Sequence, residues 1–142
     1  MLSNQTFNWP IRVYYEDTDS GGVVYHSNYL NFMERARTEW LRHLGFEQTY
    51  IRDELNVIFV VHNMQITFKK PAKFNDMLTI TSQLTNIGRG SFEFMQTITT
   101  NQPVLGQRNV LVEAQVKLAC VNALTFKPVG IPEQIRSTME QT

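Results

Sequence analysis

The sequence predicts an α+β fold in which a curved antiparallel sheet of about five strands covers one long helix. Apolar residues recur at helical spacing in one long segment, residues 28–44. After about residue 57 they alternate instead with polar residues, which is typical of strands with one buried face. One helix and one such sheet form two layers around a shared core. We therefore expect the 142 residues to form a single domain, 1–142.

The first expected element is a strand over residues 7–14, which are rich in aromatic and β-branched side chains. Pro10 removes a backbone donor near its start, so we expect this strand at an edge of the sheet. Residues 15–27 then form a loop that contains the pair Gly21 and Gly22.

The long helix is predicted from Asn28 to Leu44. Its apolar stripe consists of Tyr29, Phe32, Met33, Ala36, Trp40 and Leu44. Its opposite face is expected to carry Glu34, Arg35, Arg37 and Glu39, with Arg35 near the boundary. Ser27 or Asn28 is suited to cap the N-terminus, and Gly45 to end the helix.

The remaining chain predicts mainly strands. Residues 46–56 indicate a short helix that ends at Asn56. Period-two alternation marks four runs, at residues 64–68, 78–85, 92–99 and 110–120. Turns are expected at residues 86–90 and 101–103, and a turn of helix after Pro132.

Composition restricts the class of protein. Thirteen basic and thirteen acidic residues balance, so no nucleic-acid partner is indicated. The single cysteine, Cys120, excludes an intramolecular disulfide, and we expect it as a small buried residue of a strand rather than a catalytic thiol. There is no signal-peptide pattern and no apolar run of about 18 residues. We expect a cytoplasmic protein without a membrane span.

The most informative segment is residues 14–29, where Asp19 lies on a glycine turn shortly before the helix. A helix N-terminus offers unpaired N–H groups that stabilise an oxyanion. A carboxylate beside them suffices for attack on a thioester or ester carbonyl without serine, cysteine or metal. Spacing alone leaves equally open that Asp17 and Asp19 are turn or capping residues.

A metal site is not expected. The pattern Asp-x-Asp-x-x-Gly also opens a calcium-binding loop, but the twelfth position counted from Asp17 is Asn28, where a bidentate glutamate is needed. No set of His, Cys and Asp has metal-ligand spacing. We expect neither a metal nor another cofactor.

Several separated motifs occur along the chain: Tyr15, Thr18-Asp19, Gly22-x-Val24-Tyr25-His26, Tyr29, Glu34-Arg35-Ala36-Arg37, Phe59-Val60-Val61 and Phe68-Lys69-Lys70-Pro71-Ala72 with Asp76 and Leu78. Together they resemble the 4-hydroxybenzoyl-CoA thioesterase-like hotdog family, and most of all its acyl-CoA thioesterases associated with the Tol–Pal system. The similarity covers most of residues 7–122. It implies a hotdog fold, with the sheet curled around the helix, and hydrolysis of acyl-CoA to a carboxylic acid and free coenzyme A.

The resemblance also implies roles for individual residues. Asp19 takes the position of the general base or nucleophile. His26 is expected to orient water or contact the thioester carbonyl, although a structural role for a lone histidine remains open. Tyr15 and Thr18 would support the loop, with Thr18 steadying the Asp19 carboxylate. The oxyanion donor is expected among the N–H groups of residues 26–28.

Coenzyme A carries several phosphate charges, so its site needs cations. Lys69, Lys70 and Lys73 cluster around Pro71, and Arg89 lies in a turn between two glycines, where phosphate can approach the backbone. We expect Lys69, Lys70 and Arg89 to hold the phosphates, against the alternative that they are solvated surface charges.

An open sheet leaves an exposed edge, which favours a two-fold dimer by edge pairing. The resemblance implies active sites at that interface and a homotetramer as the next level.

One alternative function is that of a hydratase or dehydratase of acyl thioesters, but the His-Phe-Pro motif of those enzymes is absent. The other is a non-catalytic acyl-thioester or partner-binding hotdog protein, which a replaced Asp19 would favour. Acyl carrier protein is an alternative donor of the acyl group.

Overall fold

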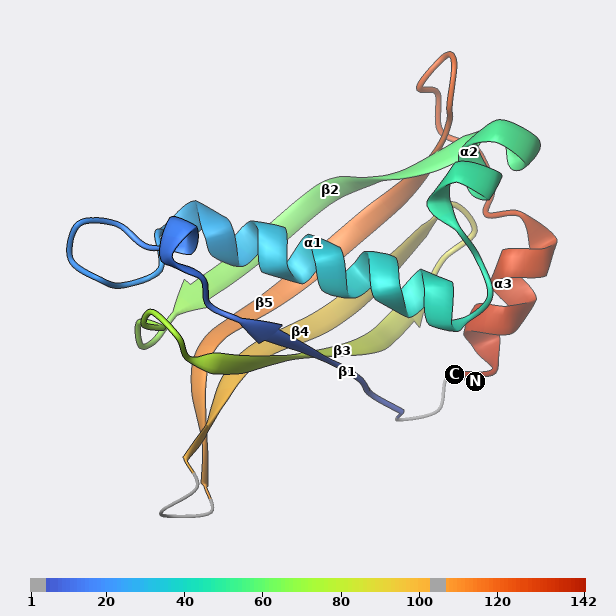
Figure 1. Ribbon diagram of the computed structural model, residues 1–142. Coiled ribbons are helices and arrows are strands. Elements are labelled where there is room, and N and C mark those ends of the chain that lie inside the picture. The colour runs from blue at the N-terminus through green and yellow to red at the C-terminus, as the bar shows by residue number, and fades with distance from the viewer. Residues whose placement is uncertain (1–4, 103–106) are drawn as a thin grey trace.

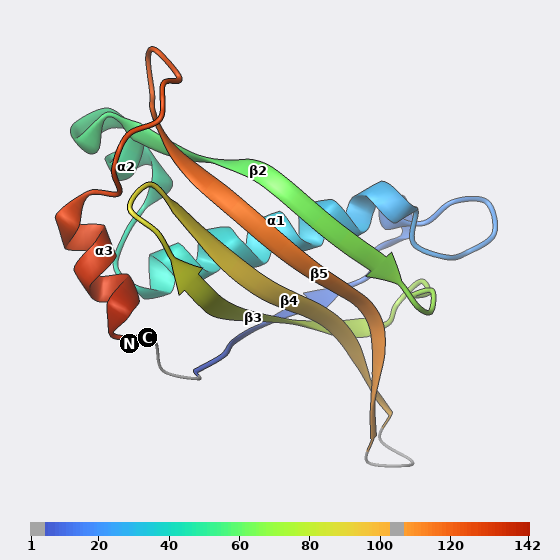
Figure 2. The same ribbon diagram turned by 180° about the vertical axis from the view of Figure 1, so that it is seen from behind.

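A computed structural model describes residues 5–102 and 107–142. Its elements are β1 (Phe7–Arg12), the short 3-10 helix η1 (Tyr15–Asp17), α1 (His26–His43), α2 (Gln48–Leu55), β2 (Val57–Phe68), β3 (Met77–Ile87), β4 (Ser91–Gln102), β5 (Gln107–Asn122) and α3 (Glu133–Glu140). The α+β prediction is confirmed, because α1 lies across one face of a five-stranded antiparallel sheet (Figure 1). Within the described residues no helix covers the other face (Figure 2).

The strand order β1-β3-β4-β5-β2 places β1 and β2 at the two edges. The two edges differ. β1 has six residues and contains Pro10, as expected of an edge strand. β2 is twelve residues long, and it exposes about half of Val61 and of Phe68. A long edge with apolar side chains is a surface that proteins cover or pair with another strand.

The core lies between α1 and the concave face of the sheet. Trp40 on α1 meets the ring of Phe94 edge-on at 4.8 Å, and Phe59 meets Phe92 at 5.0 Å. The other fully buried apolar side chains include Phe32, Met33, Ala36, Leu78, Ile80, Ile98, Val112 and Val116. These residues are the apolar sets of the predicted helix stripe and strand alternations, so the two patterns predict the two faces that meet.

The ends of α1 differ from each other. Gly45 ends the helix as predicted, since it adopts φ +101° and the N–H groups of Gly45 and Phe46 bond to the carbonyls of Arg42 and Leu41. The predicted N-terminal cap is wrong. Tyr25 precedes the first helical residue, and no side chain caps it. Asn28 lies inside the helix instead.

Arg37 corrects the predicted polar face of the helix. It is only 8% exposed, and its Nη1 donates to Oε1 of Gln96 at 2.9 Å. Gln96 in turn donates to the Met33 carbonyl and to Oγ of Ser82. Arg37 follows Ala36 and lies one turn after Met33, so it is at the rim of the apolar stripe. The curved sheet covers that rim as well as the stripe.

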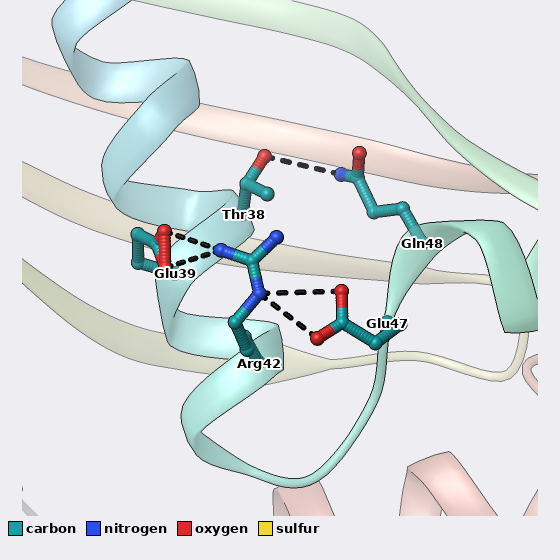
Figure 3. Close-up of polar contacts among 5 residues, drawn as sticks. All are labelled: Thr38, Glu39, Arg42, Glu47 and Gln48. Atoms are coloured by element: carbon teal, nitrogen blue, oxygen red, sulfur yellow. Dashed lines mark hydrogen bonds and ion pairs between the residues drawn. The ribbon is translucent and has the colours of Figure 1, made fainter.

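The short helix α2 packs beside the second half of α1 (Figure 3). Arg42 bonds to the carboxylates of Glu39 and Glu47, and Nε2 of Gln48 donates to Oγ1 of Thr38 at 3.2 Å. The helix ends at Asn56 in a left-handed conformation with φ 61°, as predicted.

The remaining sequence predictions mostly hold. The helix after Pro132 is α3. Of the turn predicted at residues 86–90, residues 88–90 connect β3 and β4, whereas Asn86 and Ile87 belong to β3. Asn101 and Gln102 belong to β4 rather than to a turn, and Pro103 lies outside the described residues. In the described part of the chain, no helix is long and apolar enough to cross a membrane.

One buried hydrogen bond ties α1 to the segment that follows β2. The hydroxyl of Tyr29, which is 4% exposed, accepts a bond from the N–H of Ala72 at 2.9 Å. We expect Tyr29→Phe to lower the free energy of unfolding by about 1–3 kcal/mol, because the buried N–H loses its partner. Chemical denaturation measures this, with the exposed Tyr25→Phe as the control. Equal stability of the two variants would contradict the role of the bond.

Candidate active site

The Asp19 loop, residues 18–24, is a tight hairpin that projects beyond the N-terminal end of α1 (Figure 1). The N–H of Asp19 donates to the carbonyl of Val23 at 2.9 Å, and the N–H of Gly22 donates to the carbonyl of Asp19 at 3.0 Å. Gly22 adopts φ +79°, a conformation that other residues rarely take. The loop therefore has a defined shape that depends on its second glycine.

The Asp19 carboxylate is exposed, and one of its two oxygens is hydrogen-bonded. Its Oδ1 accepts a hydrogen bond from the N–H of Gly21 at 2.8 Å. A Cβ atom at Gly21 would come within 3.2 Å of that oxygen, so the close contact favours glycine. Within the described residues no group bonds to the other oxygen. That oxygen is free to accept a proton from water or to attack a carbonyl carbon.

The N-terminus of α1 offers two open donors. The N–H of Asn28 bonds to the Tyr25 carbonyl at 2.8 Å, which removes one of the three donors expected at residues 26–28. The N–H groups of His26 and Ser27 have no hydrogen-bond acceptor in the described part of the chain. The first N–H groups of a helix have no partner inside it, and they carry the positive end of its dipole. This pair is suited to bind an oxyanion.

Asp17 holds the loop against the helix. It is 9% exposed, and its carboxylate accepts bonds from the N–H of Tyr14 at 2.8 Å and from Nδ2 of Asn28 at 3.0 Å. Its carbonyl also accepts a bond from the N–H of Tyr25. The first aspartate of the motif is thus a turn residue that positions the second. Asn28 is bound to this carboxylate and is not available as a cap.

The other predicted site residues surround the loop. His26 is the first residue of α1, and its exposed ring lies 4.5 Å from that of Tyr25 and 6.4 Å from that of Phe68. No hydrogen bond joins His26 to Asp19 in the described residues. Tyr15 is 80% exposed and meets the ring of Phe74 edge-on.

Thr18 does not contact the Asp19 carboxylate as expected. Its hydroxyl donates to the carbonyl of Tyr15 at 2.7 Å, which closes the turn of η1. The N–H of Gly21 takes the place that Thr18 was expected to fill. A short hydroxyl side chain satisfies a carbonyl within its own turn more readily than a group that follows it.

The expected cations divide between the two ends of the sheet. Lys69 and Lys70 follow β2 at the end where the Asp19 loop lies, and Lys69 pairs with Glu113 at 3.0 Å. Lys73 pairs through its backbone with Val23 in the loop itself. Arg89 follows β3 at the opposite end (Figure 1), and a strand of this length spans roughly 35 Å. Within one chain, Arg89 and the lysines do not form one surface.

Other nucleophiles and metal ligands are not gathered here. Cys120 is buried in β5 as predicted, and burial raises the pKa of its thiol to about 11. The thiol is therefore protonated at neutral pH and is not a nucleophile. In the described ranges, no three side chains of His, Cys, Asp or Glu come close enough to hold a metal ion.

A five-stranded sheet covers an uncapped helix, and a loop with an exposed carboxylate precedes that helix. Comparison with known proteins assigns this arrangement to a family of thioesterases. A family model described as the thioesterase superfamily matches residues 21–107. The chain belongs to this superfamily. It is 43% identical over 140 residues to the acyl-CoA thioester hydrolase YbgC of Escherichia coli O6:H1, and the match covers 99% of this chain and 100% of the relative.

Solved structures support the same family. A probable thioesterase from Bartonella henselae matches with a TM-score of 0.81 at 36% identity, over 90% of this chain and 100% of that one. The 4-hydroxybenzoyl-CoA thioesterase of Pseudomonas sp. strain CBS-3 matches with a TM-score of 0.85 at 16% identity, over 96% and 99%. The latter shows a shared fold. The predicted hotdog fold is confirmed.

The contact between Asp17 and Asn28 gives a test of how the loop is positioned. We expect Asn28→Ala to lower kcat for thioester hydrolysis by about 10- to 100-fold, because small displacements of a reacting group cost that much. Steady-state kinetics measure the change. Asn31→Ala, at an exposed asparagine on the same helix, is the matched control and should retain kcat. Equal rates for both variants would show that the contact does not position the loop.

Proposed function

We propose that this protein hydrolyses acyl-CoA thioesters at the Asp19 loop, giving a carboxylic acid and free coenzyme A. One observation carries the proposal. A carboxylate with an open oxygen lies on the loop that leads directly into α1, and the first two N–H groups of that helix are also open. The membership of the thioesterase superfamily supports the same reaction.

The chemistry divides between these groups. The thioester carbonyl oxygen binds at the N–H groups of His26 and Ser27, where the negative charge of the tetrahedral intermediate is stabilised by about 3–4 kcal/mol per well-placed donor. Asp19 either takes a proton from the attacking water or attacks the carbonyl carbon itself. Collapse of the intermediate expels the coenzyme A thiolate, which is then protonated. Incorporation of ¹⁸O from labelled water into Asp19 during turnover would identify the nucleophilic route.

His26 acts as an assistant in this scheme. Its backbone N–H would contribute to the oxyanion site, and its exposed imidazole, on the first residue of α1, would orient water beside the loop. Tyr15 and Thr18 support the turn that carries Asp19. The rival, a protein that binds acyl thioesters without cleaving them, does not need an open carboxylate at this position.

The proposed assembly is a homodimer formed by pairing the β2 edges, with a homotetramer as the next level. A two-fold axis makes the paired strands antiparallel, so the Val57 end of one β2 lies beside the Phe68 end of the other. The partner subunit's Arg89 then comes to the end of the joint sheet where Asp19, Lys69 and Lys70 lie. This arrangement supports a coenzyme A site built from both chains.

The proposed setting follows from the substrate. Acyl-CoA and reduced thiols occur together in the cytoplasm, where the free Cys120 is stable. Acyl carrier protein presents its acyl group on the same pantetheine arm, so it is an alternative donor. Lys69, Lys70 and Lys73 lie at the end where either donor would approach.

Asp19 is tested by removal of its charge. We expect Asp19→Asn to lower kcat for a good acyl-CoA substrate by at least ~10²-fold, because the amide is neither base nor nucleophile. Glu16→Gln removes an exposed carboxylate from the adjacent turn and is the matched control. His26→Ala should lose less than Asp19→Asn. A folded Asp19→Asn variant with nearly normal kcat would end the proposal.

Arg89 is tested by charge reversal. We expect Arg89→Glu to raise KM for acyl-CoA with little change in kcat, since phosphate contacts are equal in the ground and transition states. The effect should be larger at low salt, because exposed charges are screened within about 8–10 Å at ordinary ionic strength. An acyl-pantetheine substrate, which lacks the nucleotide, should be indifferent. Equal losses on both substrates would make Arg89 structural.

Mixed dimers test whether the site takes residues from two chains. An Asp19→Asn chain and an Arg89→Glu chain are each impaired. If one site uses Asp19 and the partner subunit's Arg89, a mixed dimer contains one unaltered site, and co-expression restores activity at low acyl-CoA. If both residues act within one chain, every site of the mixed dimer carries one defect and no recovery occurs. Sedimentation at micromolar concentration should show a dimer or tetramer.

A further inference from the structure

A cavity of about 290 Å³ lies between the second half of α1, the start of α2 and the edge strand β2. Its floor is apolar and includes Trp40, Phe59 and Phe92. Its wall is polar and includes Glu34, Arg37, Thr38 and Gln48, of which the last two are hydrogen-bonded to each other (Figure 3). Neither Asp19 nor His26 of the same chain lines it. The cavity is therefore a separate feature of the protomer that the proposed chemistry leaves unexplained.

Arg37 brings a positive charge into this cavity, and the exposed carboxylate of Glu34, which also lines the cavity, acts on that charge without forming an ion pair with it. In the described part of the chain Arg37 makes one hydrogen bond, to Gln96, and no ion pair. Burial lowers its pKa, and the charge of the exposed Glu34 opposes that shift, but a guanidinium remains protonated in proteins. A buried charge with a single partner is unfavourable. The other N–H donors of the guanidinium are available to an occupant of the cavity.

The antiparallel dimer brings this cavity to a thioester site. Within its own chain, Arg37 lies about 16 Å along α1 from the open N–H groups. When two β2 strands pair, the partner subunit's His26 approaches the Val57 end of β2, which is where Phe59 and Val61 line the cavity. An acyl group bound at the partner's loop then extends along β2 into the cavity.

We propose that the cavity binds the distal end of the acyl group and that Arg37 selects acyl groups ending in a carboxylate. This inference rests on the proposed thioesterase function and names its substrate class. A guanidinium binds a carboxylate through two parallel hydrogen bonds, and the apolar floor accommodates the methylene chain. A methyl terminus leaves the guanidinium without an acceptor after its water is displaced, so the site discriminates against it.

The first experiment compares ω-carboxyacyl-CoA with methyl-terminated acyl-CoA of equal chain length, from four to eight carbons. At the preferred length we expect kcat/KM to be at least ~10-fold higher for the carboxylate, as for a charged hydrogen bond. Arg37→Met should lower this ratio at least ~10-fold. Arg35→Met removes an exposed arginine of the same helix and should keep it. A ratio of one or less at every length, or one unchanged by Arg37→Met, would overturn the proposal.

A second variant keeps the test valid if Arg37→Met fails to fold. Gln96→Glu places a carboxylate where the amide oxygen now accepts the bond from Arg37, which gives the guanidinium an internal counter-ion. We expect the preference for ω-carboxyacyl groups to fall although Arg37 is still present. An unchanged preference contradicts the proposal. The proposal is also contradicted if the Arg37→Met dimer dissociates while the ratio of kcat/KM for the two substrates stays unchanged. Arg37 would then bind the partner chain rather than the substrate.

A binding measurement separates this inference from the proposed function. The Asp19→Asn chain is titrated with pimelate and with heptanoate, and thermal unfolding is followed. Pimelate should raise the unfolding temperature of this chain and not of an Asp19→Asn, Arg37→Met double variant, whereas heptanoate should have the smaller effect on both. If Asp19→Asn hydrolyses normally, the catalytic proposal fails while this comparison still tests the cavity. Equal effects of the two acids would overturn the inference.

Discussion

A helix that begins without a side-chain cap keeps open N–H groups, and the chemistry of the candidate site depends on this condition at the start of α1. Asn28 has the side chain that could have closed the helix end, but the buried carboxylate of Asp17 binds it. The same carboxylate anchors the backbone at Tyr14, so one residue ties the chain before the Asp19 loop to the first turn of α1. The contact between Asp17 and Asn28 therefore joins the segment that carries the proposed base to the helix that carries the proposed oxyanion site.

The length of the strands imposes the second constraint. In a sheet whose four longer strands run for 11 to 16 residues, the turns at its two ends are too far apart to serve one substrate from one chain. The Asp19 loop and Arg89 are separated in this way. Pairing of the long β2 edges would cover exposed apolar side chains and bring opposite ends of two chains together. The proposed dimer would account for both the unpaired edge and the separation of the cations.

Much of this fold could be read from the sequence, because α1 and the strands each bury one face and carry the corresponding period. Contacts made by single polar side chains could not. Ser27 and Asn28 both have cap chemistry, but the helix begins one residue before Ser27, and Asp17 binds the side chain of Asn28. The turn of Thr18 toward Tyr15 and the distance of Arg89 from Lys69 likewise depend on folded geometry. Helical spacing alone places Arg37 on the polar face of α1. The spacing does not show how far the sheet curves around the helix, and that curvature is what buries Arg37.

The burial of Arg37 also costs free energy, because it removes part of the hydration of the guanidinium. The hydrogen bond to Gln96 offsets part of this cost. Gln96 lies in the middle of β4 and is fully buried, and its two ends bond in opposite directions, to Arg37 and to Met33 with Ser82. Such a network is favourable only when each member is satisfied. Here Gln96 and Ser82 are satisfied within the chain, whereas the guanidinium makes one bond and its remaining donors reach solvent. Because burial already removes part of the hydration of the guanidinium in the free protein, a carboxylate that binds there displaces less water from the arginine than it would at an exposed one, which is how a preorganised charge discriminates between ligands.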